Sequence, residues 1–227
     1  MEAGLVEAIH ERFAALLARL QDVAAAHGHD PHKLRIVGIT KTHPVELVRA
    51  AMDAGITRLG ENRVQEAEPK IAAAPDAEWH LVGRLQSNKA RRAVRAFEVI
   101  HSIDSTELLA RVDDVAAEEG RRPRVLLQVN VSGEGSKAGL APAALAGVPA
   151  PSTADLVGLM TIAPFGVTDA GARMIFGRLR QLRDELEQRL GRGLPELSIG
   201  MSSDAEAAAA EGATLVRIGT ALFGPRG

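Results

Sequence analysis

The clearest strand of this chain lies in the stretch Leu34-Arg35-Ile36-Val37-Gly38-Ile39-Thr40-Lys41-Thr42-His43-Pro44. Its first part is a short apolar run bounded by a proline, which predicts a buried strand over Arg35–Ile39. Lys41 would then lie at the carboxyl end of the strand, where open α/β sheets and barrels carry their chemistry. A lysine amine that is partly withdrawn from water has a lowered pKa and can form a Schiff base with an aldehyde.

Short runs rich in Val, Ile and Leu alternate along the chain with longer stretches rich in Ala, Glu and Arg. Eight strand–helix units in one chain of 227 residues predict a single (β/α)₈ TIM-type barrel, and an open doubly wound sheet is the alternative. The predicted strands are Arg35–Ile39, Arg58–Leu59, Trp79–Val82, Val99–His101, Arg124–Val129, Leu156–Leu159, Leu197–Ile199 and Leu215–Ile218. The predicted helices between them are Pro44–Ala54, Val64–Ala73, Ser87–Ala96, Ser105–Glu119, Thr168–Leu190 and Ala205–Ala210.

An extra helix is predicted before the first strand. Apolar residues recur along one stripe of Leu5–Ala26, and Gly28 ends the pattern. We expect residues 1–28 to pack on the barrel and the whole chain, 1–227, to form one domain. Ser87 and Ser105 are predicted N-caps, and the Ala- and Pro-rich stretch Ala141–Thr153 is predicted to be a weak helix or a loop.

Composition excludes several classes of function. Lys and Arg number 27 and Asp and Glu number 29, so the net charge of -2 does not indicate a nucleic-acid partner. The chain has no cysteine, which excludes disulfides and thiolate metal sites, and no metal site is predicted. Charged residues interrupt residues 1–27, and no apolar run approaches a membrane span. We therefore expect a cytoplasmic protein without a membrane anchor.

Two stretches near the end of the chain are suited to a phosphate. Gly200-Met201-Ser202-Ser203 and Gly219-Thr220 each follow a predicted strand and offer hydroxyls and backbone N–H groups. These residues could instead only cap helices, and Ser203 is better explained that way because Asp204 also fits the cap. An amine at Lys41 and a phosphate site at the same barrel mouth suggest pyridoxal 5′-phosphate (PLP).

Arg217 lies on the last predicted strand, between Val216 and Ile218. A charge on a buried strand needs a partner. That partner is either an acid within the barrel or the ring nitrogen of the cofactor. A permanent cation facing this nitrogen would keep it unprotonated and so weaken carbanion chemistry.

Several strings together resemble one protein family. The resemblance extends from about Ile36 to Gly224 and is to the PLP homeostasis proteins, also called the YggS or PROSC family, which are related to the N-terminal barrel of alanine racemases. One departure is Thr40, where the family more often has serine, and both residues carry a hydroxyl. The strings are Thr40-Lys41-Thr42, Gly60-Glu61-Asn62, Trp79-His80, Leu85-Gln86-Ser87-Asn88-Lys89, Gln128-Val129-Asn130-Val131, Gly158-Leu159-Met160, Gly200-Met201-Ser202-Ser203-Asp204 and Val216-Arg217-Ile218-Gly219-Thr220.

The resemblance implies a barrel that holds PLP as a Schiff base on Lys41. It also implies an arginine, Arg217, near the pyridine nitrogen. The remaining cofactor-binding residues that it implies are phosphate contacts from Ser202, Gly219 and Thr220, with Asn62 and His80 lining the same mouth.

The choice between carrier and enzyme depends on a second base. Alanine racemases use a tyrosine from a C-terminal β domain, whereas this chain has no tyrosine, and we expect it to lack that domain. His80 or Lys137 could in principle substitute, but nothing in the sequence places either opposite Lys41. We therefore predict a PLP-binding protein of intracellular vitamin B6 homeostasis without evident catalysis and without catalytic residues.

Two enzymes remain as alternatives: a PLP-dependent amino-acid racemase of weak or narrow activity, and a Schiff-base aldolase acting on a phosphorylated sugar. Transient contact with PLP-dependent apo-enzymes and a monomeric state are further expectations. Lys137 lies in a stretch with three glycines, 132–139, and is either a solvated lysine or a residue that receives or relays PLP.

Overall fold

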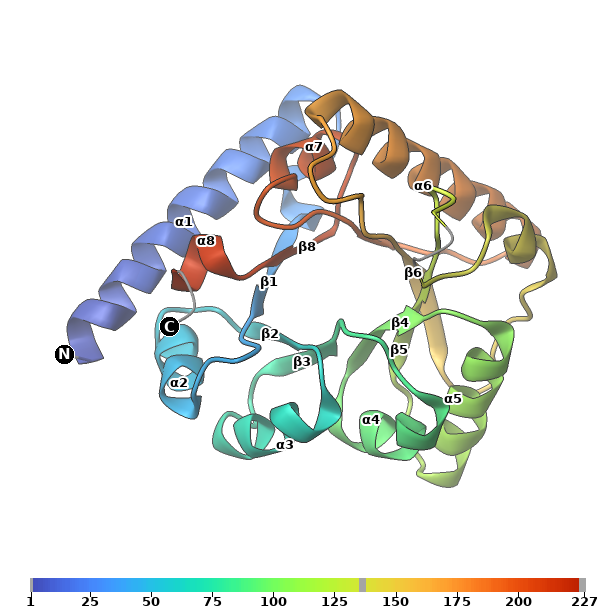
Figure 1. Cartoon of the computed structure of the whole chain (residues 1–227), viewed down its shortest axis with the longest axis horizontal. Helices are drawn as coiled ribbons and strands as arrows, with labels where there is room; N and C mark the ends of the chain where they lie inside the picture. Colours follow the sequence, from blue (N-terminus) through green and yellow to red (C-terminus); the bar gives the residue numbers. More distant parts are fainter. Residues whose placement is uncertain (1, 135–137, 225–227) are drawn as a thin grey trace.

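The computed structural model describes residues 2–134 and 138–224 and forms a closed barrel of eight parallel strands in chain order. Helices surround the strands (Figure 1). The first and last strands close the barrel, with Arg35 opposite Leu215 and Gly38 opposite Ile218. The predicted (β/α)₈ fold is confirmed, and the open-sheet alternative is wrong. The strands are β1 Arg35–Ile39, β2 Arg58–Glu61, β3 Glu78–Leu81, β4 Val99–Ile103, β5 Arg124–Gln128, β6 Asp155–Met160, β7 Glu196–Ser198 and β8 Leu215–Ile218.

The helical layer follows the predicted alternation with small differences. Ser105 accepts a hydrogen bond from the Leu108 amide and caps its helix as predicted. Ser87 does not cap a helix, because it begins a short 3₁₀ turn before the α-helix. The stretch Ala141–Thr153 contains a 3₁₀ helix. The elements are α1 Glu2–Ala26, η1 Pro31–Lys33, α2 Val45–Asp53, α3 Val64–Ala73, η2 Ser87–Lys89, α4 Ala90–Ala96, α5 Thr106–Glu118, η3 Pro142–Gly147, α6 Asp169–Leu190, α7 Ala205–Ala210 and α8 Thr220–Phe223.

The first helix packs against the outer layer of the barrel. α1 contacts α2, α7 and α8, and in Figure 1 it runs as a long blue helix along that side. Its stripe residues Ile9, Leu16 and Leu20 are buried. The apolar stripe is shielded from water because it packs against these three helices. In this position α1 covers the part of the barrel where the first and last strands meet.

Two backbone segments approach each other closely at the end of the barrel that carries the loops after the strands. Gly83, directly after β3, approaches the loop after β2 so closely that an added Cβ would lie 2.3 Å from the carbonyl oxygen of Asn62. Any larger residue would push these two loops apart. None of the described helices is long and apolar enough to cross a membrane.

Candidate functional site

An open cavity of about 670 Å³ lies at the carboxyl ends of the strands. Six of the seven predicted site residues line it: Lys41, Asn62, Ser202, Arg217, Gly219 and Thr220. They come from the ends of β1, β2, β7 and β8, so barrel closure brings together groups from both ends of the sequence. The other lining residues are Ile39, Val82, Gly83, Arg84, Gln128, Val129, Asn130, Ala138, Thr161, Ile162, Phe165, Met201 and Ser203.

The backbone on both sides of Lys41 is held by α3. The ammonium of Lys70 donates to the carbonyl oxygen of Thr40 at 2.8 Å, and the carboxylate of Glu66 accepts from the Thr42 amide. Thr42 has a φ of 66°, a left-handed conformation that is unusual for a β-branched residue. The left-handed conformation of Thr42, directly after Lys41, is therefore held by contacts with α3 rather than by local preference.

Beneath this turn lies a buried carboxylate, Glu61. Its Oε1 accepts from Lys70 Nζ at 2.7 Å and from Thr40 Oγ1 at 2.6 Å. Burial raises the pKa of Glu61, and the hydrogen bonds from Lys70 and Thr40 act in the opposite direction. Glu61, Lys70 and Glu66 thus form an ionic cluster behind the Lys41 turn, which we call the α3 clamp.

Hydroxyls and amides from the loops after β7 and β8 line the cavity as well. Gly219 precedes α8, so the amides of Thr220 and Ala221 have no acceptor within that helix. The loop after β7 is held by Asp204, whose carboxylate accepts from the Met201 amide at 2.6 Å. Ser203, interpreted from sequence as part of a helix cap, also reaches the cavity. This arrangement offers N–H and O–H donors to an anion.

Arg217 lies at the base of the cavity and is only 5% exposed. Its Nη1 donates to Ser198 Oγ at 2.7 Å and its Nη2 to the carbonyl oxygen of Thr161 at 2.9 Å. Burial lowers the pKa of Arg217 to about 10, and the charge of Asp204 acts in the opposite direction. Among the described residues, its hydrogen-bond acceptors are these two neutral groups. Instead of the salt bridge that was one of the two sequence-based interpretations, Arg217 makes hydrogen bonds to two neutral acceptors.

Contrary to the prediction from the sequence, His80 does not line the cavity. It is completely buried, with Nδ1 2.8 Å from His101 Nε2 and Nε2 2.8 Å from Glu78 Oε1. Val82, two residues further along the same face of the chain, is the one that reaches the cavity. The direction of the His80 side chain was thus readable from the strand, but its depth in the barrel was not.

Other lining residues were missed by the sequence analysis. Gln128 and Asn130 share one face at the end of β5, and this parity, together with their place in a family string, was the available signal. Arg84, Thr161 and Phe165 carried no comparable signal. Lys137 lies outside the described residues.

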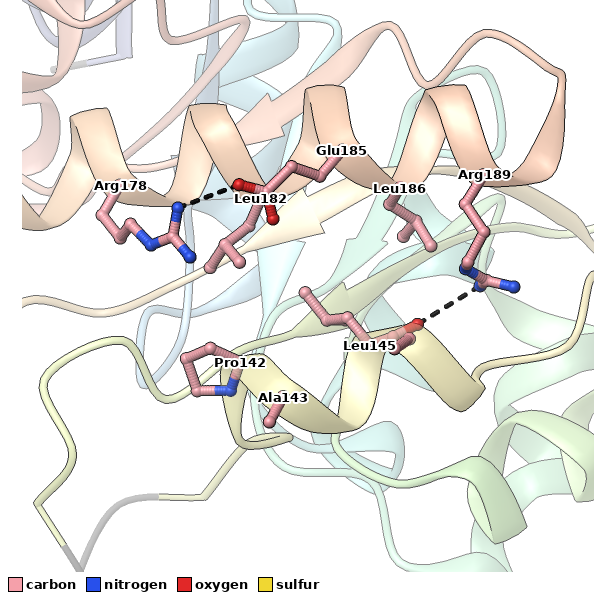
Figure 2. Close-up of a pocket in the computed structure, with 9 residues that line it drawn as sticks. Pro142, Ala143, Leu145, Arg178, Leu182, Glu185, Leu186 and Arg189 are labelled. Carbon is pink, nitrogen blue, oxygen red and sulfur yellow. Dashed lines mark hydrogen bonds and ion pairs between the residues drawn. The ribbon is translucent and has the colours of Figure 1, made fainter.

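A second hollow of about 460 Å³ lies on the outer layer, between η3 and α6 (Figure 2). Leu145, Leu182 and Leu186 form its apolar part, while Arg189 donates to the Leu145 carbonyl oxygen at 3.2 Å. It shares no lining residue with the cavity at the strand ends. Within residues 2–134 and 138–224 there is also no group of three or more acidic or histidine side chains that could hold a metal ion. The cavity around Lys41 is therefore the candidate site.

The fold and this cavity define a class: (β/α)₈ barrels with a lysine after the first strand and loops rich in hydrogen-bond donors after the last two. The family model for the alanine racemase N-terminal domain matches residues 12–227. A pyridoxal phosphate homeostasis protein of Aquifex aeolicus is 40% identical over 223 residues, covering 95% of this chain and 97% of that protein. The one of Escherichia coli K12 is 36% identical, covering 96% and 97%. The chain belongs to this family of pyridoxal phosphate homeostasis proteins within the alanine racemase N-terminal domain group.

Solved structures agree with this assignment. PipY of Synechococcus elongatus PCC7942, with PLP bound, is 41% identical with a TM-score of 0.84, covering 95% of this chain and 99% of that one. An alanine racemase of Clostridium difficile 630 has a TM-score of 0.71 at 13% identity, which shows the likeness of fold alone. The matched region spans 91% of this chain and 58% of the racemase chain.

Proposed function

We propose that this protein binds PLP as a Schiff base on Lys41 and acts in intracellular PLP homeostasis as a carrier without catalysis. The single observation that carries the proposal is the content of the cavity: Lys41, Arg217 and the donors of Ser202, Gly219 and Thr220 line one space. PipY, 41% identical, has been solved with PLP bound.

The residues present fit this cofactor. Lys41 would hold the aldehyde carbon, and the hydroxyls of Ser202 and Thr220 with the amide of Gly219 would hold the phosphate. The guanidinium of Arg217, which has only neutral partners among the described residues, would face the ring nitrogen. When bound, PLP supplies a reactive aldehyde, and the chain's own residues bind and orient it.

A carrier is favoured over an enzyme by the ionisable groups of the cavity. Among the described lining residues, only Lys41, Arg84 and Arg217 have ionisable side chains. Arginine stays protonated in proteins and is a poor base. Since the chain also has no tyrosine, two-base racemisation would have Lys41 as its single base.

The test is an absorption spectrum of the purified protein with PLP, followed by borohydride reduction and peptide mass mapping. We expect a yellow band and a pyridoxyl adduct on Lys41, both lost in Lys41→Ala. Lys33→Ala, at the end of η1 before β1, is the matched control and should keep both. An adduct spread over surface lysines, or no band at all, would overturn the proposal.

The alternative function is a PLP-dependent racemase of weak or narrow activity, favoured only by the barrel that the chain shares with racemases. Chiral analysis of amino acids incubated with the PLP-loaded protein separates the two. Turnover that disappears in Lys41→Ala would establish the racemase, whereas unchanged enantiomers support the carrier.

The proposal extends to organisation and partners. We propose one domain over residues 1–227, a cytoplasmic location, a monomer, and transient contact with PLP-dependent apo-enzymes. Phe165 supports the last point, because it is a fully exposed aromatic side chain at the rim of the cavity. Sedimentation analysis tests the monomer, and a transfer assay is described in the Discussion.

A further inference from the structure

A continuous line of polar side chains crosses the barrel interior beneath Arg217. We call Glu78, His80, His101, Ser198 and Arg217 the interior file. Glu78 Oε1 is 2.8 Å from His80 Nε2, and His80 Nδ1 is 2.8 Å from His101 Nε2. His101 Nδ1 is 2.8 Å from Ser198 Oγ, which is 2.7 Å from Arg217 Nη1.

Such a file is unusual for the inside of a barrel, which branched aliphatic side chains normally fill. His80, His101 and Ser198 are fully buried. Burying polar groups costs free energy unless each is hydrogen-bonded, so the file needs every one of its bonds. Two small aliphatic clusters are separate from the main hydrophobic core, one of Val99, Leu126, Val157 and Met160 and the other of Val37, Ile39 and Leu215.

The lower end of the file fixes the direction of its hydrogen bonds. Arg124 Nη2 is 2.8 Å from Glu78 Oε2 and Arg58 Nε is 3.3 Å from Glu78 Oε1. Although burial opposes ionisation, the contacts of His80 and Arg124 hold the pKa of Glu78 below its ordinary value. An ionised carboxylate only accepts, so the proton of a neutral His80 must be on Nε2.

The rest of the file follows from that proton. With Nε2–H on His80, its Nδ1 is an acceptor, and Nε2 of His101 must carry the donor proton. Nδ1 of His101 then accepts the hydroxyl proton of Ser198. Ser198 Oγ in turn accepts from Arg217, which can only donate. All donors point from Arg217 toward Glu78, and no bond within the file is left unmade.

Burial favours the neutral form of both imidazoles. Facing His101 are His80 on β3, Arg217 on β8 and Arg124 on β5. Burial, reinforced by these neighbours, places the pKa of His101 well below its ordinary value. Burial also lowers the pKa of His80, and the nearby cations Arg124 and Arg58 act in the same direction. The contact with Glu78 opposes this shift.

We propose that Glu78, His80, His101 and Ser198 are positioning residues that hold the guanidinium of Arg217 at the base of the cofactor site through one unidirectional chain of hydrogen bonds. This rests on the proposed function. The carboxylate at the end of the file, Glu78, lies at the opposite rim of the barrel, four hydrogen bonds from Arg217. Within the described residues Arg217 donates to neutral acceptors, and the charge of Asp204 acts on it from the loop after β7. The guanidinium therefore keeps its positive charge at the base of the cavity.

The first test uses the apo-protein and does not depend on PLP. Nitrogen-15 NMR of the imidazole rings should show His80 and His101 as neutral Nε2–H tautomers at neutral pH. An Nδ1–H tautomer, or an imidazolium at neutral pH in either ring, would overturn the direction of the file.

The second test breaks the file at Ser198. In Ser198→Ala, the His101 Nδ1 signal should shift to that of an unbonded acceptor, and bound PLP should dissociate about 10-fold faster, as expected for one lost charge-assisted hydrogen bond. Ser102→Ala is the matched control, a fully buried strand serine outside the file. It should leave both the His101 signal and the PLP dissociation rate at their wild-type values.

Equal PLP dissociation from Ser198→Ala and Ser102→Ala would overturn the positioning role. If Ser198→Ala does not fold, His101→Gln gives the same comparison at the next member of the file. If no PLP binds to the wild type, the proposed function fails, while the tautomers of the apo-protein still decide whether the file exists.

Discussion

Lys70 donates a hydrogen bond of 2.8 Å from its buried ammonium to the carbonyl oxygen of Thr40, the residue directly before Lys41. The same ammonium lies 2.7 Å from Glu61. A charged side chain on α3 therefore fixes the backbone next to Lys41. The stability of the α3 clamp and the position of the Lys41 amine are coupled for this reason.

Replacing Lys70 with Met should lower the free energy of unfolding by about 3–5 kcal/mol, because the buried carboxylate of Glu61 would lose its cationic partner. Urea denaturation measures the change. Adding Glu61→Gln removes the unpaired charge and should recover part of the loss. A single-variant loss below about 1 kcal/mol would mean that the α3 clamp does not carry this energy.

Stability should fall as the pH drops below about 6.5. Burial lowers the pKa of His80 and of His101, so the unfolded chain binds protons that the folded chain does not, and each histidine removes at most about 1.4 kcal/mol per pH unit. The free energy of unfolding, followed by urea titration from pH 7 to 5.5, should show this slope.

The matched comparison replaces single histidines. His101→Gln should reduce the slope of the free energy of unfolding with pH, and His27→Gln, at an exposed position, should leave it unchanged. Equal slopes in the wild type and His101→Gln would contradict the assignment of a buried neutral imidazole.

Asp113 on α5 accepts from the amides of Ser152, Thr153 and Ala154 at 2.7–2.8 Å. This carboxylate ties the segment before β6 to the helical layer. Asp113→Ala should cost about 1–3 kcal/mol of unfolding free energy, since three amides lose their acceptor. Thermal unfolding tests this, with Asp114→Ala on the exposed face as the control, and equal loss in both variants would count against the tie.

Phe165→Ser, compared with the wild type at equal PLP occupancy, should slow PLP transfer to an apo-enzyme several-fold, because its fully exposed ring is the most exposed apolar side chain of the described cavity lining. The assay follows recovery of activity in a PLP-depleted enzyme. Met174→Ser, on α6 and outside the cavity lining, is the control. Unchanged transfer in Phe165→Ser would exclude Phe165 from the contact.

The barrel could be predicted because the apolar pattern of each strand and helix is contained within its own short segment, as in Arg35–Ile39. Lys41 and the loop residues Ser202 and Thr220 were predictable because they directly follow strands. His80 was misplaced since alternation gives the direction of a side chain and not its depth. The bond of His101 to Ser198 joins residues 97 apart in sequence, and such pairs depend on the barrel register, which no local pattern contains.

The pairing of β1 with β8 also sets an order of events during synthesis. Val37 is registered against Arg217, so the strand that ends at Lys41 and the strand that carries Arg217 become neighbours only after almost the whole chain has left the ribosome. A nascent chain exposes the amine of Lys41 without the opposing anion site. If Lys41 holds PLP as proposed, stable capture of the aldehyde requires the finished barrel, and loading with cofactor follows translation.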